Sequence, residues 1–332
     1  MAGTAPEHLT RTTSSETDRR SRRLRRLGEE LEELGLPGFP TNARAMILEE
    51  VDWALRPEVH ERFVPSGGTV LEPTIAPERW SETTELEIAR ISLGETPLND
   101  ARRFVDGLSS WLVRSTSDKR DEWLLFDRPA GSERDLVVLA EAMGAVLVQR
   151  HPSGAVRIVG EFGVLRWDGL RWHHEPPVAQ WLSALAANGS PGDLGVLEAI
   201  LRLAVYDLGA LGVGALLVQR PGELPAPGME EQLSRPPPLL VRKPFHLGPI
   251  RHALAQVDGA AVFDAGGVLR LLGVRLVPTR RAERELAPWR GTRHTSALRY
   301  SYDDPSATVV VVSESGPISV LRAGAVVSLQ DL

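Results

Sequence analysis

Cysteine is absent from the 332-residue chain. Without thiols the chain can form neither a disulfide framework nor a thiolate metal site. Disulfides are rare in the reducing cytoplasm, and a chain without cysteine is compatible with that compartment. We therefore expect a cytoplasmic protein.

Long hydrophobic runs are also missing. Residues 1–23 have no apolar segment of the kind that a signal peptide requires. The apolar stretch at 136–148 contains a glutamate and is too short to span a bilayer. The sequence therefore predicts a soluble protein without a membrane partner.

Positive charge does not dominate the chain, because 38 lysines and arginines stand against 44 aspartates and glutamates. Phosphate contacts dominate affinity for nucleic acids, so we do not expect nucleic acid as a partner. One local exception is an arginine-rich stretch at 19–26, followed by glutamates at 29–33. A nucleic-acid or membrane role for this stretch is one interpretation. We favour the other, a solvated helix face that pairs in a dimer or docks on its own domain, because no aromatic residues interleave the charges.

The length and a hydrophobic content of 42% are enough for two cores. Near the N-terminus, leucines recur at the spacing of one helix face: Leu24, Leu27, Leu31 and Leu34. The predicted organisation is a disordered tail at 1–17, N-terminal helices over 18–64, a smaller, sensor-like α/β domain at 65–176 and a second α/β domain at 177–332.

The first α/β domain is predicted from hydrophobic patterns and turn residues. We expect a loop or a domain edge at 65–77, helices at 99–114 and 135–143, strands at 123–126 and 145–149, and a β-meander up to 174. Aromatic residues gather at its end: Trp167, Trp172, His173 and His174. They could form a ligand-sensing patch or cap the core. Neighbouring strand residues point to opposite faces, which argues against a metal site at the two histidines.

The second domain begins after Pro176 and Pro177, which disfavour regular structure. Asp193 is placed to cap an apolar helix that runs to residue 208. We expect strands at 211–219, 239–241, 259–263, 269–276, 308–313 and 318–322, and helices at 178–188, 247–256 and 292–300. This interleaving indicates a mixed β-sheet with flanking helices.

Three short segments of the second domain carry groups that suit a nucleotide. Asp258-Gly259-Ala260 lies between a helix and a strand, and its glycine lets the backbone approach a ligand closely. Gly291-Thr292-Arg293-His294 opens a helix, and a helix N-terminus with a hydroxyl and an arginine suits a polyphosphate. Ser313 and Glu314 follow a strand and present a hydroxyl and a carboxylate. Each segment alone is a common turn or surface element, but together they are specific.

In this order and spacing the segments resemble the diadenylate cyclase (DAC) domain, the nucleotide-binding domain of the DNA-integrity scanning protein and its relatives. The family pattern is Asp-Gly-Ala, a β-hairpin, Gly-Thr-Arg-His-Arg and a strand that ends in serine and often glutamate. Here the match runs through DGAAVF, GTRHTSALRY and VVVVSES. It covers residues 178–332 and is strongest at 250–325. The upstream segment IVGEFGVLRWDG is similar to the DACNV-type sensor domain found fused to such cyclases.

The resemblance implies that two ATP molecules are joined into cyclic di-AMP, with release of pyrophosphate, in a face-to-face dimer. Each 3′-hydroxyl would attack the α-phosphate of the ATP on the opposite protomer. The resemblance assigns catalysis to Asp258, Arg293 and His294. It assigns nucleotide binding to Gly259, Ala260, Gly291, Thr292, Thr295, Ser313 and Glu314. Asp258 and Glu314 would hold Mg²⁺ or Mn²⁺, which neutralises the triphosphate.

The chain departs from the family pattern at two positions. Thr295 stands where the family has a second arginine, and Ser315 stands where many members have a second glutamate. Arg299 could supply the missing cation, because positions four apart share a helix face. Two other classes therefore stay open: a DAC-like module that binds nucleotide without making a product, and a structural module that only dimerises. The joint presence of the three segments favours the cyclase.

Overall fold

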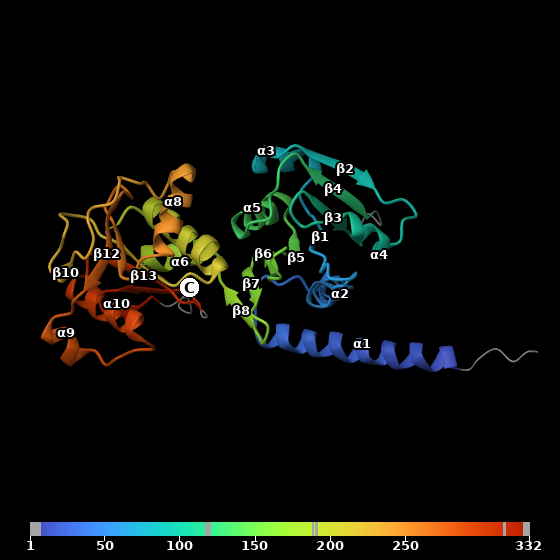
Figure 1. Cartoon of the computed structure of the whole chain (residues 1–332), viewed down its shortest axis with the longest axis horizontal. Coiled ribbons are helices and arrows are strands. Elements are labelled where there is room, and N and C mark those ends of the chain that lie inside the picture. The colour runs from blue at the N-terminus through green and yellow to red at the C-terminus, as the bar shows by residue number, and fades with distance from the viewer. Residues whose placement is uncertain (1–7, 117–120, 188, 190–191, 315–316, 328–332) are drawn as a thin grey trace, which may run out of the picture. The chain divides into compact units, whose positions relative to one another are not determined.

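The computed structural model describes residues 8–116, 121–187, 189, 192–314 and 317–327. The chain divides into two compact units, Met1–His174 and Glu175–Leu332 (Figure 1). Each unit is built on one mixed β-sheet with helices packed against it, which confirms the predicted α/β class. Within the described ranges, no helix combines the length and the apolar character needed to cross a membrane.

The first unit opens with two helices, α1 (His8–Glu33) and α2 (Arg44–Leu55). Leu27 and Leu31 of α1 share a core cluster with Ile47 and Val51 of α2, so α1 docks on its own unit. Helix α1 already begins at His8 and thus includes ten residues that we expected in the disordered tail. Once a helix is nucleated, each added residue costs little, which lets it extend beyond its packed part.

The first sheet has the strand order β2-β4-β3-β1-β5-β6-β7-β8. Strands β1 and β3 are parallel, whereas β1–β5, β2–β4, β3–β4, β5–β6 and β6–β7 are antiparallel. The strands are β1 (Gly67–Leu71), β2 (Ile88–Ser92), β3 (Ser110–Arg114), β4 (Glu122–Phe126), β5 (Val146–Arg150), β6 (Val156–Gly160), β7 (Gly163–Trp167) and β8 (Trp172–Glu175). The helical segments between them are η1 (Pro77–Arg79), α3 (Trp80–Thr84), α4 (Leu98–Ala101), η2 (Arg102–Phe104) and α5 (Glu133–Met143).

Strand β1 corrects the loop that we predicted at 65–77. A Cβ atom on Gly67 would lie 2.6 Å from the Trp53 ring, and one on Gly68 would lie 2.3 Å from the Trp111 ring. These glycines therefore make room for two tryptophans inside the fold, although in the sequence they resemble a loop.

The helix predicted at 99–114 is also wrong beyond residue 104. Asp106 Oδ1 accepts hydrogen bonds from the backbone N–H groups of Leu108, Ser109 and Ser110 at 2.7, 2.8 and 2.9 Å. This carboxylate builds a tight turn, and such side-chain bonds to the backbone compete with a helix. The chain then enters β3, where Trp111 and Leu112 are fully buried.

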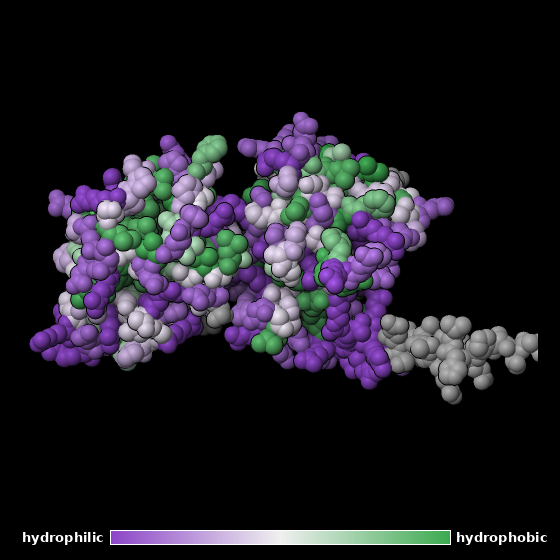
Figure 2. Space-filling model, in the orientation of Figure 1, coloured by the Kyte–Doolittle hydropathy of each residue, from purple (hydrophilic) through white to green (hydrophobic). Residues whose placement is uncertain are grey.

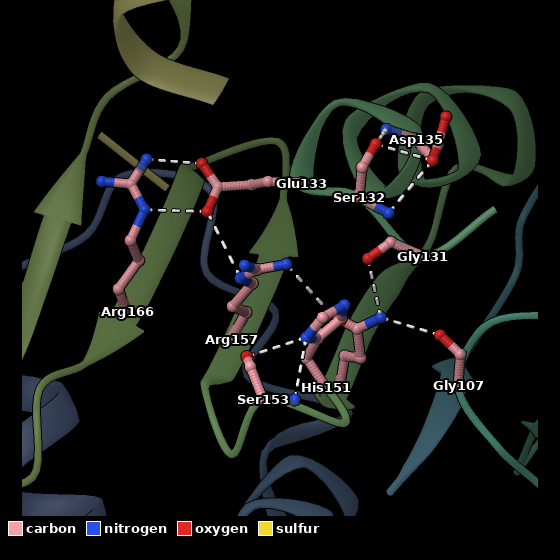
Figure 3. Close-up of polar contacts among 10 residues, drawn as sticks. Gly107, Gly131, Ser132, Glu133, Asp135, His151, Ser153, Arg157 and Arg166 are labelled. Carbon is pink, nitrogen blue, oxygen red and sulfur yellow. Dashed lines mark hydrogen bonds and ion pairs between the residues drawn. The ribbon is translucent and has the colours of Figure 1, made fainter. Parts of the chain in front are cut away.

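A buried polar network joins α5 to the sheet (Figure 3). Glu133 is 1% exposed and accepts hydrogen bonds from Nε (2.8 Å) and Nη2 of Arg166 on β7. Arg157 of β6 lies 3.5 Å from the same carboxylate. Gln149 of β5 donates from Nε2 to the carbonyl oxygen of Gly107 at 2.7 Å. Removing one partner would leave a buried charge unpaired, so the network ties these elements firmly together.

The two histidines of β8 have separate partners. His173 Nε2 lies 2.6 Å from Asp168 Oδ2, and His174 Nε2 lies 2.6 Å from the carbonyl oxygen of Phe162. The rings of Trp167 and Trp172 lie 5.3 Å apart, next to the core cluster that also holds α1 and α2. This arrangement supports the core-capping interpretation of these aromatic residues.

The second sheet has the order β10-β12-β11-β9-β13-β14-β15, in which β9 and β11 are parallel. The strands are β9 (Ala215–Gln219), β10 (Met229–Glu230), β11 (Ala260–Phe263), β12 (Leu269–Leu276), β13 (Thr308–Val312), β14 (Ser319–Arg322) and β15 (Ala325–Val326). The helices are α6 (Val178–Ala187), α7 (Leu194–Arg202), the π-helical segment Leu203–Leu208, η4 (Gly209–Leu211), α8 (Pro244–Leu254), α9 (Arg280–Glu285) and α10 (Thr292–Asp303). The strand predicted at 239–241 is reduced to one bridge between Leu240 and Val268.

Helix α10 covers one face of this sheet and closes its core. Ala297 and Tyr300 of α10 share a cluster with Leu216 of β9 and Val309 of β13. Every residue of β13 is buried, and the π-helical segment after α7 contacts both β9 and β13. The central strands are therefore covered by protein, while the visible surface is mostly hydrophilic with scattered hydrophobic patches (Figure 2).

Candidate nucleotide site

Four strands of the second unit bring their ends together at one edge of the sheet. β9 and β11 begin there, and β12 and β13, which run antiparallel to them, end there. A cavity of about 730 Å³ opens at this edge, a size that suits a small-molecule ligand. All three predicted motifs contribute to its lining, through Gly259, Gly291, Thr292, Arg293, His294 and Ser313.

The N-terminus of α10 lies at this cavity. Gly291 is the N-cap residue, and no side chain caps the helix. A Cβ atom on Gly291 would meet no atom within 4 Å, so the approach to the helix end is open. The free N–H groups and the helix dipole together favour an anion here. Thr292 and Arg293 add a hydroxyl and a guanidinium from the first turn.

Arg293 and Glu314 meet beside the backbone of Gly214. Arg293 Nη1 lies 3.7 Å from Glu314 Oε1, and the two side chains are 36% and 70% exposed. A Cβ atom on Gly214 would come within 2.2 Å of Arg293 Nη1. The missing side chain therefore leaves the space that the guanidinium occupies. Because exposed ion pairs are weak, an incoming phosphate can displace the Glu314 carboxylate from Arg293.

His294 is 9% exposed and packs edge-to-face against Trp289, with ring centroids 5.2 Å apart. Its Nε2 atom has no hydrogen-bond partner within the part of the chain that the structure describes. Burial, together with the positive charges of Arg290 and Arg293, lowers the pKa of His294. The lowered pKa favours the neutral imidazole at pH 7; the residue contributes to the cavity lining, while Nε2 itself is buried.

Gly259 turns the backbone into β11 with a φ of +100°. A Cβ atom there would lie 2.7 Å from the carbonyl carbon of Gly273, so only glycine fits. Asp258 is exposed and adjoins the cavity through Gly259 without lining it. Ala260 is fully buried and belongs to the core under α10, so the structure places it away from the cavity surface.

Thr295 has a bonding role of its own. Its Oγ1 accepts a hydrogen bond from the backbone N–H of Trp289 at 3.0 Å and donates one to the Trp289 carbonyl at 3.1 Å. The side chain thus fixes the loop before α10 and does not line the cavity. Ser315, the second departure from the family pattern, lies outside the described residues.

Arg299 is engaged elsewhere, because its Nε and Nη2 both donate to the carbonyl of Leu286 at 3.2 Å. Arg290 precedes the helix start and donates from Nη1 to Ser319 Oγ at 3.5 Å. Its guanidinium carbon lies 4.7 Å from the centroid of the Trp289 ring, and its charge acts on the pKa of His294. Arg290, directly before Gly291, thus brings a positive charge close to the N-terminus of α10.

Sequence reasoning missed Glu283, which lines this cavity, and also Gly214 and Arg290, which act on the lining residues Arg293 and His294. Gly214 carried a signal, because a glycine at the start of the apolar strand LGVGALLV indicates close approach of another group. Glu283 of α9 lines the cavity with a further carboxylate, but in the sequence it belongs to an ordinary charged helix.

The carboxylates allow a test of the expected divalent cation. Among the described residues, no group of three or more histidines, aspartates or glutamates could hold a metal ion. Asp258 and Glu314 are exposed next to the lining residues Gly259 and Ser313. Mg²⁺ is commonly bound by one or two carboxylates together with substrate phosphates and water. These donors fit a cation that is held jointly with a triphosphate, but not one that is held by protein alone.

Two family models match the chain. Residues 245–326 match the family described as "DisA bacterial checkpoint controller nucleotide-binding", DAC, which confirms the predicted resemblance. Residues 25–175 match "Probable sensor domain DACNK", so the upstream domain is of the DACNK type and not of the DACNV type that we expected.

Similar solved structures include the "hypothetical membrane spanning protein from Bacillus cereus", at 20% identity and a TM-score of 0.31. That likeness covers 44% of this chain and 76% of the other. A double mutant of DacA from Staphylococcus aureus is 18% identical with a TM-score of 0.29, over 41% of this chain and 89% of that one. No curated protein matches the chain.

Proposed function

We propose that this protein, which joins a DAC nucleotide-binding domain to a DACNK sensor domain, is a diadenylate cyclase. The observation that carries the proposal is the cavity at the sheet edge. Three separate motifs place a glycine turn, a helix N-terminus with Arg293 and His294, and the hydroxyl of Ser313 around it. These are the groups that bind a polyphosphate.

In the proposed reaction two ATP molecules give one cyclic di-AMP and two pyrophosphates. Each ribose 3′-hydroxyl loses its proton and attacks the α-phosphorus of the other ATP. A 3′–5′ phosphodiester bond forms, and the bond between that phosphorus and the oxygen bridging to the β-phosphate breaks. Each motif occurs once in this chain, so the second ATP must be presented by a second protomer. The product is symmetric, which favours a two-fold, face-to-face dimer.

The residues divide this work by their chemistry. The helix N-terminus, Thr292 and Arg293 bind the phosphates and stabilise the charge that develops on them. His294, for which the neutral form is favoured, lines the same cavity. Asp258 is the carboxylate closest in sequence to the glycine turn and would act at the 3′-hydroxyl, either on its proton or through the cation held there.

Mg²⁺ or Mn²⁺ would be held by Asp258 and Glu314 together with the triphosphate. When bound, the cation neutralises negative charge on the phosphates. The sensor domain would modulate this activity, and a cytoplasmic location would suit a cysteine-free chain that uses ATP.

A second candidate function is a nucleotide-binding module with little or no turnover. The hydrogen bonds of Thr295 favour it, because that side chain holds Trp289 where relatives place a phosphate-binding arginine. Loss of such a cation costs transition-state stabilisation more than it costs nucleotide binding.

One experiment separates these functions. The full chain is incubated with ATP and Mn²⁺ or Mg²⁺ over a series of protein dilutions, and the nucleotides are resolved by chromatography. A cyclase yields cyclic di-AMP and pyrophosphate, with specific activity that falls on dilution. ATP binding without product under either metal would establish the binding module instead.

A further inference from the structure

The first unit contains a second large cavity, remote in sequence from the DAC motifs. It has a volume of about 660 Å³, which lies in the range of small-molecule sites. It lies between the end of α2, the loop before β1, and the segment that runs from α4 to β3. Three aromatic rings contribute to its lining: Trp53, Phe63 and Phe104.

The apolar side chains at this cavity are unusually exposed. Phe63 and Phe104 are 69% and 68% exposed, and Val59 beside them is 53% exposed. A two-residue turn presents Val59 and Phe63, since His60 and Phe63 exchange backbone hydrogen bonds at 3.2 and 2.8 Å. Exposed apolar groups gathered at one place mark a binding site, and their position around a hollow favours a small molecule over a flat protein surface.

Another part of the lining, at 102–110, is held by hydrogen bonds. Asp106 accepts three backbone hydrogen bonds that fix the turn into β3. The next residue, Gly107, is held through its carbonyl by Gln149, which is fully buried (Figure 3). Arg102 lies with its guanidinium carbon 5.4 Å from the centroid of the Trp53 ring and donates to the buried Glu50 at 2.7 Å. The cavity is therefore preformed on this side.

Most charged groups of the lining already have partners. Arg102 lies 2.7 Å from Glu50, Arg103 lies 3.7 Å from Asp100, and Asp106 accepts three backbone hydrogen bonds. A strongly charged ligand would gain little from such a lining. Aromatic faces bind flat rings by stacking or edge contact, at a small cost in conformational entropy.

We propose that this cavity binds a planar aromatic small molecule of low net charge, and that it is the ligand site of the sensor domain. Phe63 and Phe104 contact the ring system at the mouth. Trp53 contacts the ring system from the interior of the cavity. This inference does not depend on the cyclase activity of the second unit.

N-phenyl-1-naphthylamine, an uncharged aromatic dye that fluoresces in apolar surroundings, is a suitable probe for the full chain. We expect saturable binding, and a rise of about tenfold in the dissociation constant for Phe104→Ser, since one aromatic contact is lost. Phe63→Ser should have a similar effect. Both side chains are largely exposed, so the fold should tolerate either change. Phe245→Ser is the matched control, because Phe245 is 93% exposed on α8 and should leave binding unchanged.

The Ser66→Trp variant tests whether the dye binds inside the cavity or only on exposed apolar surface. Ser66 lines the hollow, and within the described ranges its hydroxyl has no hydrogen bond that the change would remove. Filling the hollow should abolish dye binding, although the variant exposes more apolar surface. Unchanged or stronger dye binding by Ser66→Trp, or an equal loss in Phe245→Ser, would overturn the proposal. Self-association of the wild type that Phe104→Ser removes would assign the patch to a second copy of the chain and would overturn it as well.

Discussion

Arg293 and Glu314 form an ion pair of 3.7 Å that joins the helix N-terminus to the end of β13. The pair links two motifs that are far apart in the sequence and leaves both charges accessible to solvent. In the absence of nucleotide, Glu314 partly neutralises the cation that a phosphate would bind. Removal of the Glu314 carboxylate should therefore have opposite effects on ATP binding without metal and on metal-dependent turnover.

Glu314→Gln should therefore strengthen ATP binding when no metal is present and weaken turnover with Mn²⁺. Removing the carboxylate frees Arg293, and the gain should be at most about fivefold, because an exposed ion pair contributes at most about 1 kcal/mol. Calorimetry in the presence of a chelator and initial rates with Mn²⁺ would measure the two effects.

Arg293→Ala should weaken ATP binding both with and without metal. Gly214→Ala should act in the same direction by crowding the guanidinium, without altering either charge. Equal effects of Glu314→Gln with and without metal would exclude a metal role for Glu314.

Asp258→Asn should reduce cyclic di-AMP formation at least about a hundredfold, which is typical for removal of an acid–base group. Asp258 is exposed, so the nearly isosteric change should leave the melting temperature unaltered. Asp264→Asn is a useful comparison. Asp264 Oδ1 accepts from the backbone of Gly266 and Val268 in the turn between β11 and β12, and Oδ2 accepts from Arg270 Nε at 2.6 Å. Asparagine can keep the Oδ1 bonds, but its NH₂ group cannot accept from Arg270, so the change should lower stability more than activity per folded molecule. A fully active Asp258→Asn protein would remove this residue from the mechanism.

The sequence predicts an element best where the hydrophobic periodicity and the flanking turn residues indicate the same boundaries. Strand β12 and helix α5 were predicted to within two residues, because their patterns are unbroken and are bounded by turn residues. Strand β1 was missed because Gly67 and Gly68 have the composition of a loop. Their function becomes visible only when Trp53 and Trp111, which come from other elements, are in place.

The three motifs of the candidate site could be predicted from the sequence, but the cavity that they line together could not. Strand order decides that the starts of β9 and β11 meet the ends of β12 and β13, and the local sequence does not specify that order. Through this topology alone, Glu283 lines the cavity and Gly214 lies against the cavity residue Arg293. For Thr295 and Arg299 the helical spacing was known, but it does not predict their bonds. Thr295 bonds to the backbone of Trp289 and Arg299 to that of Leu286, both in the loop before α10.

Residues 175–332 should fold and bind ATP without the first unit. The cut must keep Glu175, because its carboxylate is 1% exposed and accepts a hydrogen bond from the backbone N–H of Ile318 at 3.1 Å. A chain that begins at Pro177 lacks this acceptor and should be less stable by about 1–3 kcal/mol, the cost of leaving a buried donor unpaired. Urea unfolding of the two fragments would measure the difference. Equal stability would show that the bond contributes nothing, and loss of ATP binding by a folded 175–332 fragment would contradict an autonomous nucleotide domain.

His294 should make the second unit sensitive to acid. Its pKa is lowered in the folded state by burial and by two arginines, so the unfolded chain binds a proton more readily. The free energy of unfolding should therefore fall as the pH drops from about 7 to about 5, through the ordinary range of histidine. His294→Gln should flatten this part of the profile. His252→Gln on the exposed side of α8 is the control and should leave the slope as it is. A slope unchanged by His294→Gln would show that other groups set the acid sensitivity.

Arg290, and not Arg299, should compensate for the arginine that Thr295 replaces. Arg290 precedes Gly291, its guanidinium carbon lies 4.7 Å from the centroid of the Trp289 ring, and its charge reaches His294. Arg299 is bound to the carbonyl of Leu286 through two nitrogens. Arg290→Gln should weaken ATP binding about tenfold, the size expected for one charge-assisted phosphate contact.

Arg299→Gln is the matched variant, because it removes the same charge one helical turn beyond Thr295. It should leave ATP affinity within about twofold and should instead lower the melting temperature, because two hydrogen bonds to the loop before α10 are lost. Isothermal titration with a non-hydrolysable ATP analogue and thermal unfolding of both variants would separate these roles. If Arg299→Gln loses affinity while Arg290→Gln retains it, the missing cation is supplied along the helix face as the sequence spacing first indicated, and the loop before α10 serves only to position Trp289.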